Sequence, residues 1–162
     1  MKRIVLVTAM LVVLVSGVFG DGGYQELDWL TTIEEALISR PELQKLDSTE
    51  DTTTFYSSGV VAGYDCNLIF LFGNTEGLIS VIVEFIDTID EESLRDALES
   101  KYVEIDSNWW DWYLYADKDG RKTLTYIEFR TPMGENAFLW YAYPPVYEGI
   151  KAAEKEERES GL

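Results

Sequence analysis

The sequence predicts an α+β fold in which two tandem helix-plus-three-strand units share one antiparallel sheet covered by helices on one face, with a C-terminal helix. The first observation is a repeat. Residues 31–77 match residues 88–134 at nine of 47 positions when the chain is shifted by 57, about three times the number that average residue usage gives. The second observation is that in each copy a helical pattern precedes three strand-like runs.

The first unit, about residues 29–86, begins with a helix. Thr31 and Thr32 each stand three residues before a glutamate, which is the pattern of a capping box. Pro41 should interrupt this helix or begin a second short turn, because proline lacks the amide donor, and an acidic loop is expected over 46–51. Three runs rich in β-branched and aromatic residues follow and are separated by turn residues around Gly63 and 73–77. The predicted strands are 53–61, 67–72 and 78–86.

The second unit, about residues 87–144, repeats this order. Thr88 and Glu91 form the capping box of a helix that is expected to run to residue 103. Pro144-Pro145 should stop the last strand, and proline suits the first turn of the C-terminal helix, about 145–160. The predicted strands of this unit are 110–116, 123–130 and 137–143.

The first twenty residues are typical of an export signal. Lys2 and Arg3 precede an apolar run over 4–15, and small residues lie around a plausible cleavage point after Gly20. The run is shorter than the roughly 20 residues that span a bilayer. We therefore expect an exported protein, periplasmic or extracellular, with a single domain over 21–162, a loose lead-in over 21–28 and no further transmembrane segment.

Charge and residue types exclude several classes of function. The chain of 162 residues has a formal net charge of −17 and contains no histidine, so nucleic acid and anionic lipid are unexpected partners. Histidine-based catalytic triads and metal sites are ruled out in their usual forms, and we predict neither cofactor nor metal. Asp119-Gly120 indicates a hairpin turn rather than a calcium loop. Cys66, the single cysteine, should be buried or pair between chains.

Alternation along the strands assigns two faces to the predicted sheet. The apolar face, expected to lie under the helices, comprises Leu68, Phe70, Phe72, Val81, Val83 and Phe85 with their counterparts Thr125, Ile127, Phe129, Leu139, Tyr141 and Tyr143. The other face mixes aromatic and charged residues, as binding surfaces do. It is either an open ligand or partner surface or is covered by the C-terminal helix or a homodimer partner. The candidate binding residues on it are Tyr113, Tyr115, Tyr126, Glu128, Arg130, Phe138 and Trp140.

Tandem helix-plus-antiparallel-strand units behind a signal peptide, with an aromatic outer sheet face, resemble the β-lactamase inhibitor protein fold and the related outer-membrane assembly lipoprotein domain. The resemblance covers most of residues 29–144 and rests on the order of elements and on composition. It implies recognition of another protein through the sheet face.

We therefore expect a non-enzymatic exported protein that binds another exported or envelope protein through its aromatic sheet face. The alternative is a carbohydrate-binding module of the cell envelope, in which Trp110, Trp112 and Trp140 would stack on a glycan. A third hypothesis is a hydrolase with Glu84 or Glu128 as its acid. The sequence does not predict the oligomeric state.

Overall fold

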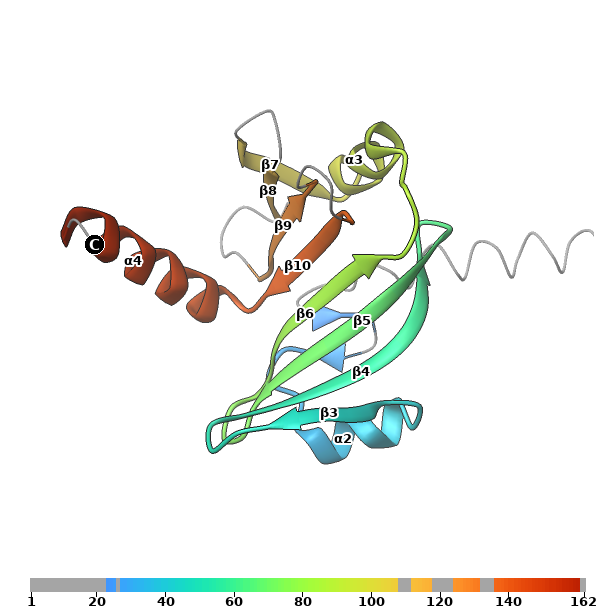
Figure 1. The fold of residues 1–162 in the computed structure, drawn as a ribbon, viewed down its shortest axis with the longest axis vertical. Coiled ribbons are helices and arrows are strands. Elements are labelled where there is room, and N and C mark those ends of the chain that lie inside the picture. The colour runs from blue at the N-terminus through green and yellow to red at the C-terminus, as the bar shows by residue number, and fades with distance from the viewer. Residues whose placement is uncertain (1–22, 26, 108–111, 118–123, 132–135, 161–162) are drawn as a thin grey trace, which may run out of the picture.

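The structure is a computed structural model that describes residues 23–25, 27–107, 112–117, 124–131 and 136–160. It shows an α+β fold with an eight-stranded, open, antiparallel sheet and, among the described residues, three helices including the expected C-terminal helix (Figure 1). The first half comprises β1 (Gly23–Tyr24), β2 (Leu27–Asp28), α2 (Ile33–Ser39), β3 (Gln44–Ser48), β4 (Thr52–Val61), β5 (Tyr64–Gly73) and β6 (Gly77–Phe85). The second half comprises α3 (Glu91–Glu99), β7 (Tyr102–Ser107), β8 (Trp112–Asp117), β9 (Tyr126–Arg130), β10 (Phe138–Ala142) and α4 (Pro144–Ser160).

The strand order of the large sheet is β3-β4-β5-β6-β10-β9-β8-β7. Each half therefore forms a four-stranded meander, and the last strands of the two meanders, β6 and β10, pair antiparallel at the centre. The helices α2 and α3 occur at corresponding places in the two halves, and Figure 1 shows α2 beside the edge strand β3 and α3 beside the opposite edge strand β7.

The three-strand units of the sequence analysis were wrong by one strand each. Residues 44–48, largely assigned to an acidic loop, form β3, and residues 102–107, at the end of the expected second helix, form β7. Both are edge strands, and in each the register shifts around one extra apolar residue, Leu46 or Ile105. Such β-bulges are common at sheet edges. The edge strands lack the clean alternation of apolar and polar residues that identifies a half-buried strand.

The helix starts agree in part with the sequence patterns. Thr32 caps α2, and its hydroxyl and the Glu35 carboxylate form the expected capping box. The helix α3 is present, but its predicted cap was wrong, because Asp90 rather than Thr88 is the N-cap and its carboxylate accepts a hydrogen bond from the Ser93 amide. The helix ends at Glu99, which leaves the following residues free to form β7.

The apolar sheet face is the core, as predicted. Ala36 of α2 and Leu94 and Leu98 of α3 are buried in the same apolar cluster as this face. The described residues of the predicted loose lead-in are packed: Tyr24 and Leu27 are buried in this core, and the Tyr24 ring packs edge-on against Phe70 and Tyr141. The sheet residues of the core include Leu68, Phe70, Phe72, Val81, Val83, Phe85, Ile127, Phe129, Leu139 and Tyr141.

Short segments before each helix connect the two halves. The Trp29 indole, just before α2, donates hydrogen bonds to the Leu124 carbonyl (2.8 Å) and the Thr125 hydroxyl (3.0 Å), next to β9 of the second half. The Asp90 amide, just before α3, donates to the Tyr64 hydroxyl (3.1 Å) of β5 in the first half. Each half is therefore fastened to the other at the place where its helix begins.

Gly77 allows the segment before α2 to pack against the start of β6. It has a φ of +95°, and an added Cβ would lie 2.3 Å from the Leu30 carbonyl oxygen and 2.6 Å from that of Thr31. These two residues are hydrogen-bonded to Leu78 through their backbones. Backbone cannot move aside as the end of a side chain can, so the position requires glycine.

We predict that Gly77→Ala lowers the free energy of unfolding by about 3 kcal/mol or more, through the left-handed conformation and the clash together. Gly63→Ala is the matched control. Gly63 also has a positive φ, of +87°, but an added Cβ would meet nothing within 4 Å, so its cost should be about 1 kcal/mol. Urea denaturation measures both, and equal losses would contradict the role given to the Leu30 contact.

Candidate functional site

The candidate site is the sheet face opposite the core, here called the outer face. The central pairing places Ile82 opposite Trp140 and Glu84 opposite Phe138, and β9 continues the row with Glu128 opposite Trp140 and Arg130 opposite Phe138. Directly paired residues lie on the same side of a sheet. Five of the seven candidate residues therefore share the outer face, as expected: Tyr126, Glu128, Arg130, Phe138 and Trp140.

Tyr113 and Tyr115 were assigned to the wrong face. They pair with the core residues Phe129 and Ile127, and Tyr115 is fully buried in the core. The ungapped repeat matched Tyr113 to Tyr56, but strand pairing makes Thr53 its counterpart, three residues earlier. A shift by an odd number of residues moves a side chain to the other face of a strand. Tyr56 itself lies on the outer face, opposite Ile69.

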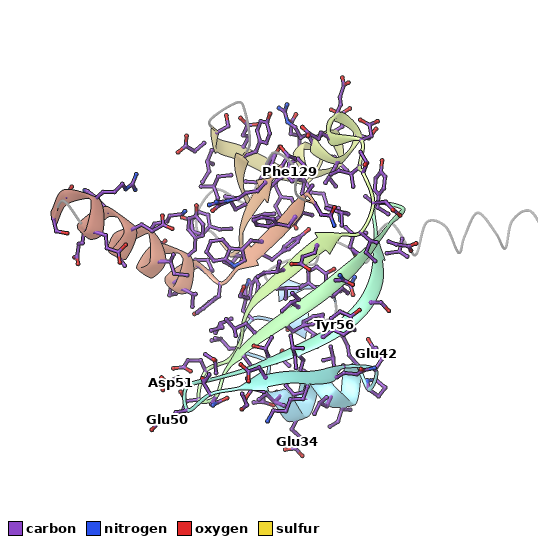
Figure 2. All side chains as sticks on the ribbon, viewed as in Figure 1. Glu34, Glu42, Glu50, Asp51, Tyr56 and Phe129 are labelled. Atoms are coloured by element: carbon purple, nitrogen blue, oxygen red, sulfur yellow. The ribbon has the colours of Figure 1, made fainter. Side chains whose placement is uncertain are left out.

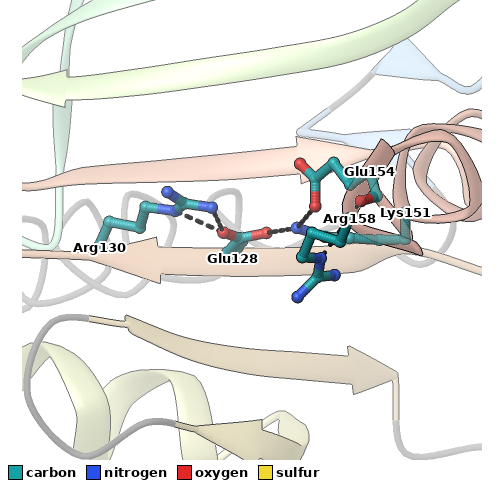
Figure 3. Close-up of polar contacts among 5 residues, drawn as sticks. All are labelled: Glu128, Arg130, Lys151, Glu154 and Arg158. Carbon is teal, nitrogen blue, oxygen red and sulfur yellow. Dashed lines mark hydrogen bonds and ion pairs between the residues drawn. The ribbon is translucent and has the colours of Figure 1, made fainter. Parts of the chain in front are cut away.

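Glu128 is the central charged group of the outer face. Its carboxylate is only 1% exposed and lies between two cations (Figure 3). Arg130 donates a hydrogen bond from Nε to Oε1, and its Nη2 forms an ion pair with the same oxygen. Lys151 of α4 places its Nζ 3.5 Å from Oε2. Among the described residues no hydrogen bond of normal geometry reaches Oε2. A buried carboxylate is stable only when it is paired, so both cations matter to this site.

Aromatic rings surround this carboxylate. Tyr147 of α4 stacks on Tyr126 with ring centroids 4.6 Å apart and lies 5.4 Å from the Trp140 ring. The Trp140 indole donates a 2.7 Å hydrogen bond to the Ser80 hydroxyl on β6. We call Tyr126, Glu128 and Trp140 the platform. The first two turns of α4 cover it, so covering by the C-terminal helix, which the sequence left as one alternative, applies to this part of the face.

The outer face of the first half has a different character. Ile69, Leu71 and Ile82 are half-buried and contact neither of the buried apolar clusters, and no described helix packs over them (Figure 1). Tyr56, labelled on β4 in Figure 2, is half-buried and donates a hydrogen bond to Asn67 (3.1 Å). We call Tyr56, Ile69, Leu71 and Ile82 the open patch. It lies beside the platform, across the central strand pair.

Acidic residues border the open patch. Asp47, Asp65 and Glu84 are exposed and lie on the outer face by register. Figure 2 shows further acidic side chains in the first half: Glu34 on α2, Glu42 between α2 and β3, and Glu50 and Asp51 in the β3–β4 turn. The surroundings of the open patch are therefore strongly negative.

Burial and the adjacent Glu128 charge raise the pKa of the Tyr147 hydroxyl above its ordinary value. Nearby Glu154 and Tyr126 also raise this pKa. The Lys151 ammonium lies 5.4 Å from the Tyr147 ring centroid. The ionised form of Tyr147 is therefore disfavoured while α4 packs on the platform. Burial also raises the pKa of the Cys66 thiol, to about 11, and this cysteine is free and buried in the core. The thiol is therefore protonated and inaccessible at neutral pH.

The other sequence candidates are only partly described. Trp110 lies outside the described residues, and of Trp112 only the strand position on β8 is described. Trp140 packs against Tyr147, so its ring is not free to form a stacking platform for a sugar while α4 is in place. Glu84 is exposed on the outer face, whereas Glu128 is buried between its two cations.

Comparison of the chain with protein-family models, with curated proteins and with solved structures finds no match.

We predict unequal costs for removing the two members of the Glu128–Arg130 pair. Arg130→Met leaves the buried carboxylate with Lys151, at 3.5 Å, as its remaining described cation. This change should lower the free energy of unfolding by about 3 kcal/mol. Glu128→Gln leaves two cations whose side chains are 43% and 33% exposed and should cost about 1 kcal/mol. Chemical denaturation measures both, and a larger loss for Glu128→Gln would contradict this account.

Tyr147 should make the protein less stable in alkali. Its pKa in the folded protein exceeds that of an unfolded tyrosine, about 10, so above that pH the unfolded chain releases the proton first. Stability should then fall with pH by up to about 1.4 kcal/mol per pH unit for this one group. Tyr147→Phe keeps the ring and should lose less stability between pH 9 and 11 in urea titrations. Identical pH profiles would show that Tyr147 is not ionised preferentially in the unfolded state.

Proposed function

We propose that this chain is an exported, non-enzymatic protein that binds another protein through the outer face of its sheet. The observation that supports this best is the open patch. Apolar side chains on Ile69, Leu71 and Ile82 lie on a sheet face without a helix over them, whereas the equivalent part of the second half is covered by α4. An uncovered apolar face with polar surroundings is typical of interaction sites.

Charge indicates the kind of partner. Each exposed charged side chain that borders the open patch on the outer face of the first half is acidic, namely Asp47, Asp65 and Glu84. Complementary charge at the margin of an interface accelerates association and excludes partners of like charge. The partner therefore presents an apolar contact surface with lysine or arginine around it.

Export is part of the proposal and is supported by the signal pattern of residues 1–20, which lie outside the described residues. No helix within the described ranges is both long and apolar enough to span a membrane. The resemblance to the β-lactamase inhibitor protein fold supports protein recognition through a sheet face, and it stays a prediction.

The test is capture of partners from extracytoplasmic proteins with the purified mature chain. The variant Ile69→Lys/Ile82→Lys places two cations in the open patch and should weaken binding of a genuine partner at least tenfold. Ile38→Lys/Leu46→Lys is the matched control, because both residues are strongly exposed and lie on α2 and β3. A partner retained by the control and lost by the patch variant supports the proposal. Partners retained equally by both variants would refute it.

A further inference from the structure

Two members of the platform, Glu128 and Trp140, are held partly by residues of the sheet. The polar end of Trp140 is held by Ser80 on β6, and the Oε1 atom of Glu128 is held by Arg130 on the same strand. Strand pairing fixes Tyr126 next to Ala142 and Glu128 next to Trp140. The sheet therefore holds the Trp140 indole and one oxygen of the Glu128 carboxylate, whereas the Tyr126 ring contacts α4.

The helix α4 contributes few groups to this contact. Tyr147 stacks between the platform rings, and Lys151, four residues later and so on the same helix face, pairs with Glu128. A weaker contact joins the Tyr126 hydroxyl to Glu148 at 3.5 Å. Residues 152–160 are exposed, and Figure 1 shows the helix extending away from the sheet. The first two turns therefore account for the attachment.

The lysine does not satisfy its carboxylate. Charge-assisted hydrogen bonds between ammonium and carboxylate groups are about 2.7–2.9 Å long, but Lys151 Nζ lies 3.5 Å from Glu128 Oε2 and 3.2 Å from Glu154. Oε2 is buried and, among the described residues, accepts no hydrogen bond. With α4 in place, one buried oxygen of the platform therefore has an ion pair but, within the described part of the chain, no hydrogen bond.

We propose that the platform is a docking site for a helix of a partner protein that carries an aromatic residue and, four positions later, a lysine, and that α4 is its built-in occupant. The partner helix displaces the first two turns of α4, places its ring between Tyr126 and Trp140, and pairs its ammonium with Glu128. This proposal rests on the proposed function in that the partner is a protein. It assigns the recognition of one lysine of the partner to the platform, a part of the outer face separate from the open patch.

The chemistry of the platform selects this class of ligand. When α4 is displaced, Oε2 of Glu128 loses its ion pair with Lys151 while Arg130 still holds Oε1, and an incoming helix that buries the carboxylate again must bring a cation to it. Stacked rings favour an aromatic side chain in an offset arrangement. The spacing of four residues between ring and ammonium is the one that α4 itself uses, and it places both groups on one face of a helix.

The experiment uses a fluorescently labelled peptide with the sequence of residues 143–155 as the probe and the full chain as the receptor. The receptor variant Tyr147→Ala/Lys151→Ala removes both anchors of α4 and should bind the peptide at least tenfold more tightly than the unaltered chain, since the site is then free. A peptide with the same two alanines is the matched control and should not bind. Lys151→Ala alone, at a partly exposed residue, is the receptor to use if the double variant does not fold.

Glu128→Gln added to either receptor should weaken peptide binding at least tenfold. The proposal is overturned if the peptide binds the anchor-free and unaltered receptors equally, or if Glu128→Gln leaves binding unchanged. A concentration-dependent dimer of the unaltered chain that is lost with Tyr147→Ala would overturn it in favour of exchange of α4 between two copies. Ile69→Lys alone, two strands away from Trp140, should leave peptide binding intact, so failure of the open patch and failure of the platform are distinguishable.

Discussion

The antiparallel pairing of β6 with β10 is the contact on which the rest of the structure depends. It joins the last strands of two four-stranded meanders into a single sheet. Its register also decides what each face carries, because Val81 and Val83 meet Tyr141 and Leu139 in the core, whereas Ile82 meets Trp140 on the outer face. A slip by one residue would exchange the two faces along the whole strand pair.

The central pairing does not act alone, since the chain crosses between the halves before each helix. Trp29 hydrogen-bonds beside β9, and Asp90 hydrogen-bonds to Tyr64 at the start of β5. The core is likewise shared: Tyr24, from the beginning of the described chain, packs on Phe70 of the first half and Tyr141 of the second. The two units therefore resemble each other in the order of their elements and share one core.

Periodicity and the repeat predicted the α+β class, the six inner strands and the core face, because inner strands bury every second residue and so carry a strong pattern. The edge strands β3 and β7 were missed because their own sequences carry no clear strand pattern. They are recognised by their pairing with β4 and β8. The site was predicted less well. Tyr113 was misplaced by an odd shift that only strand pairing reveals, and the burial of Glu128 depends on where α4 packs. Neither property is local in sequence.

The bulges at the two sheet edges bear on aggregation. An open sheet of eight strands has two unpaired rows of backbone groups, and such edges can template fibrils. Here β3 carries the bulge Lys45-Leu46-Asp47 and β7 the bulge Glu104-Ile105-Asp106, each with charged residues around one apolar residue. An incoming strand would have to accept the kink and desolvate those charges. The similar halves thus protect both edges of the sheet. A chain without the bulge in β3 or β7 would be the form prone to assemble edge to edge.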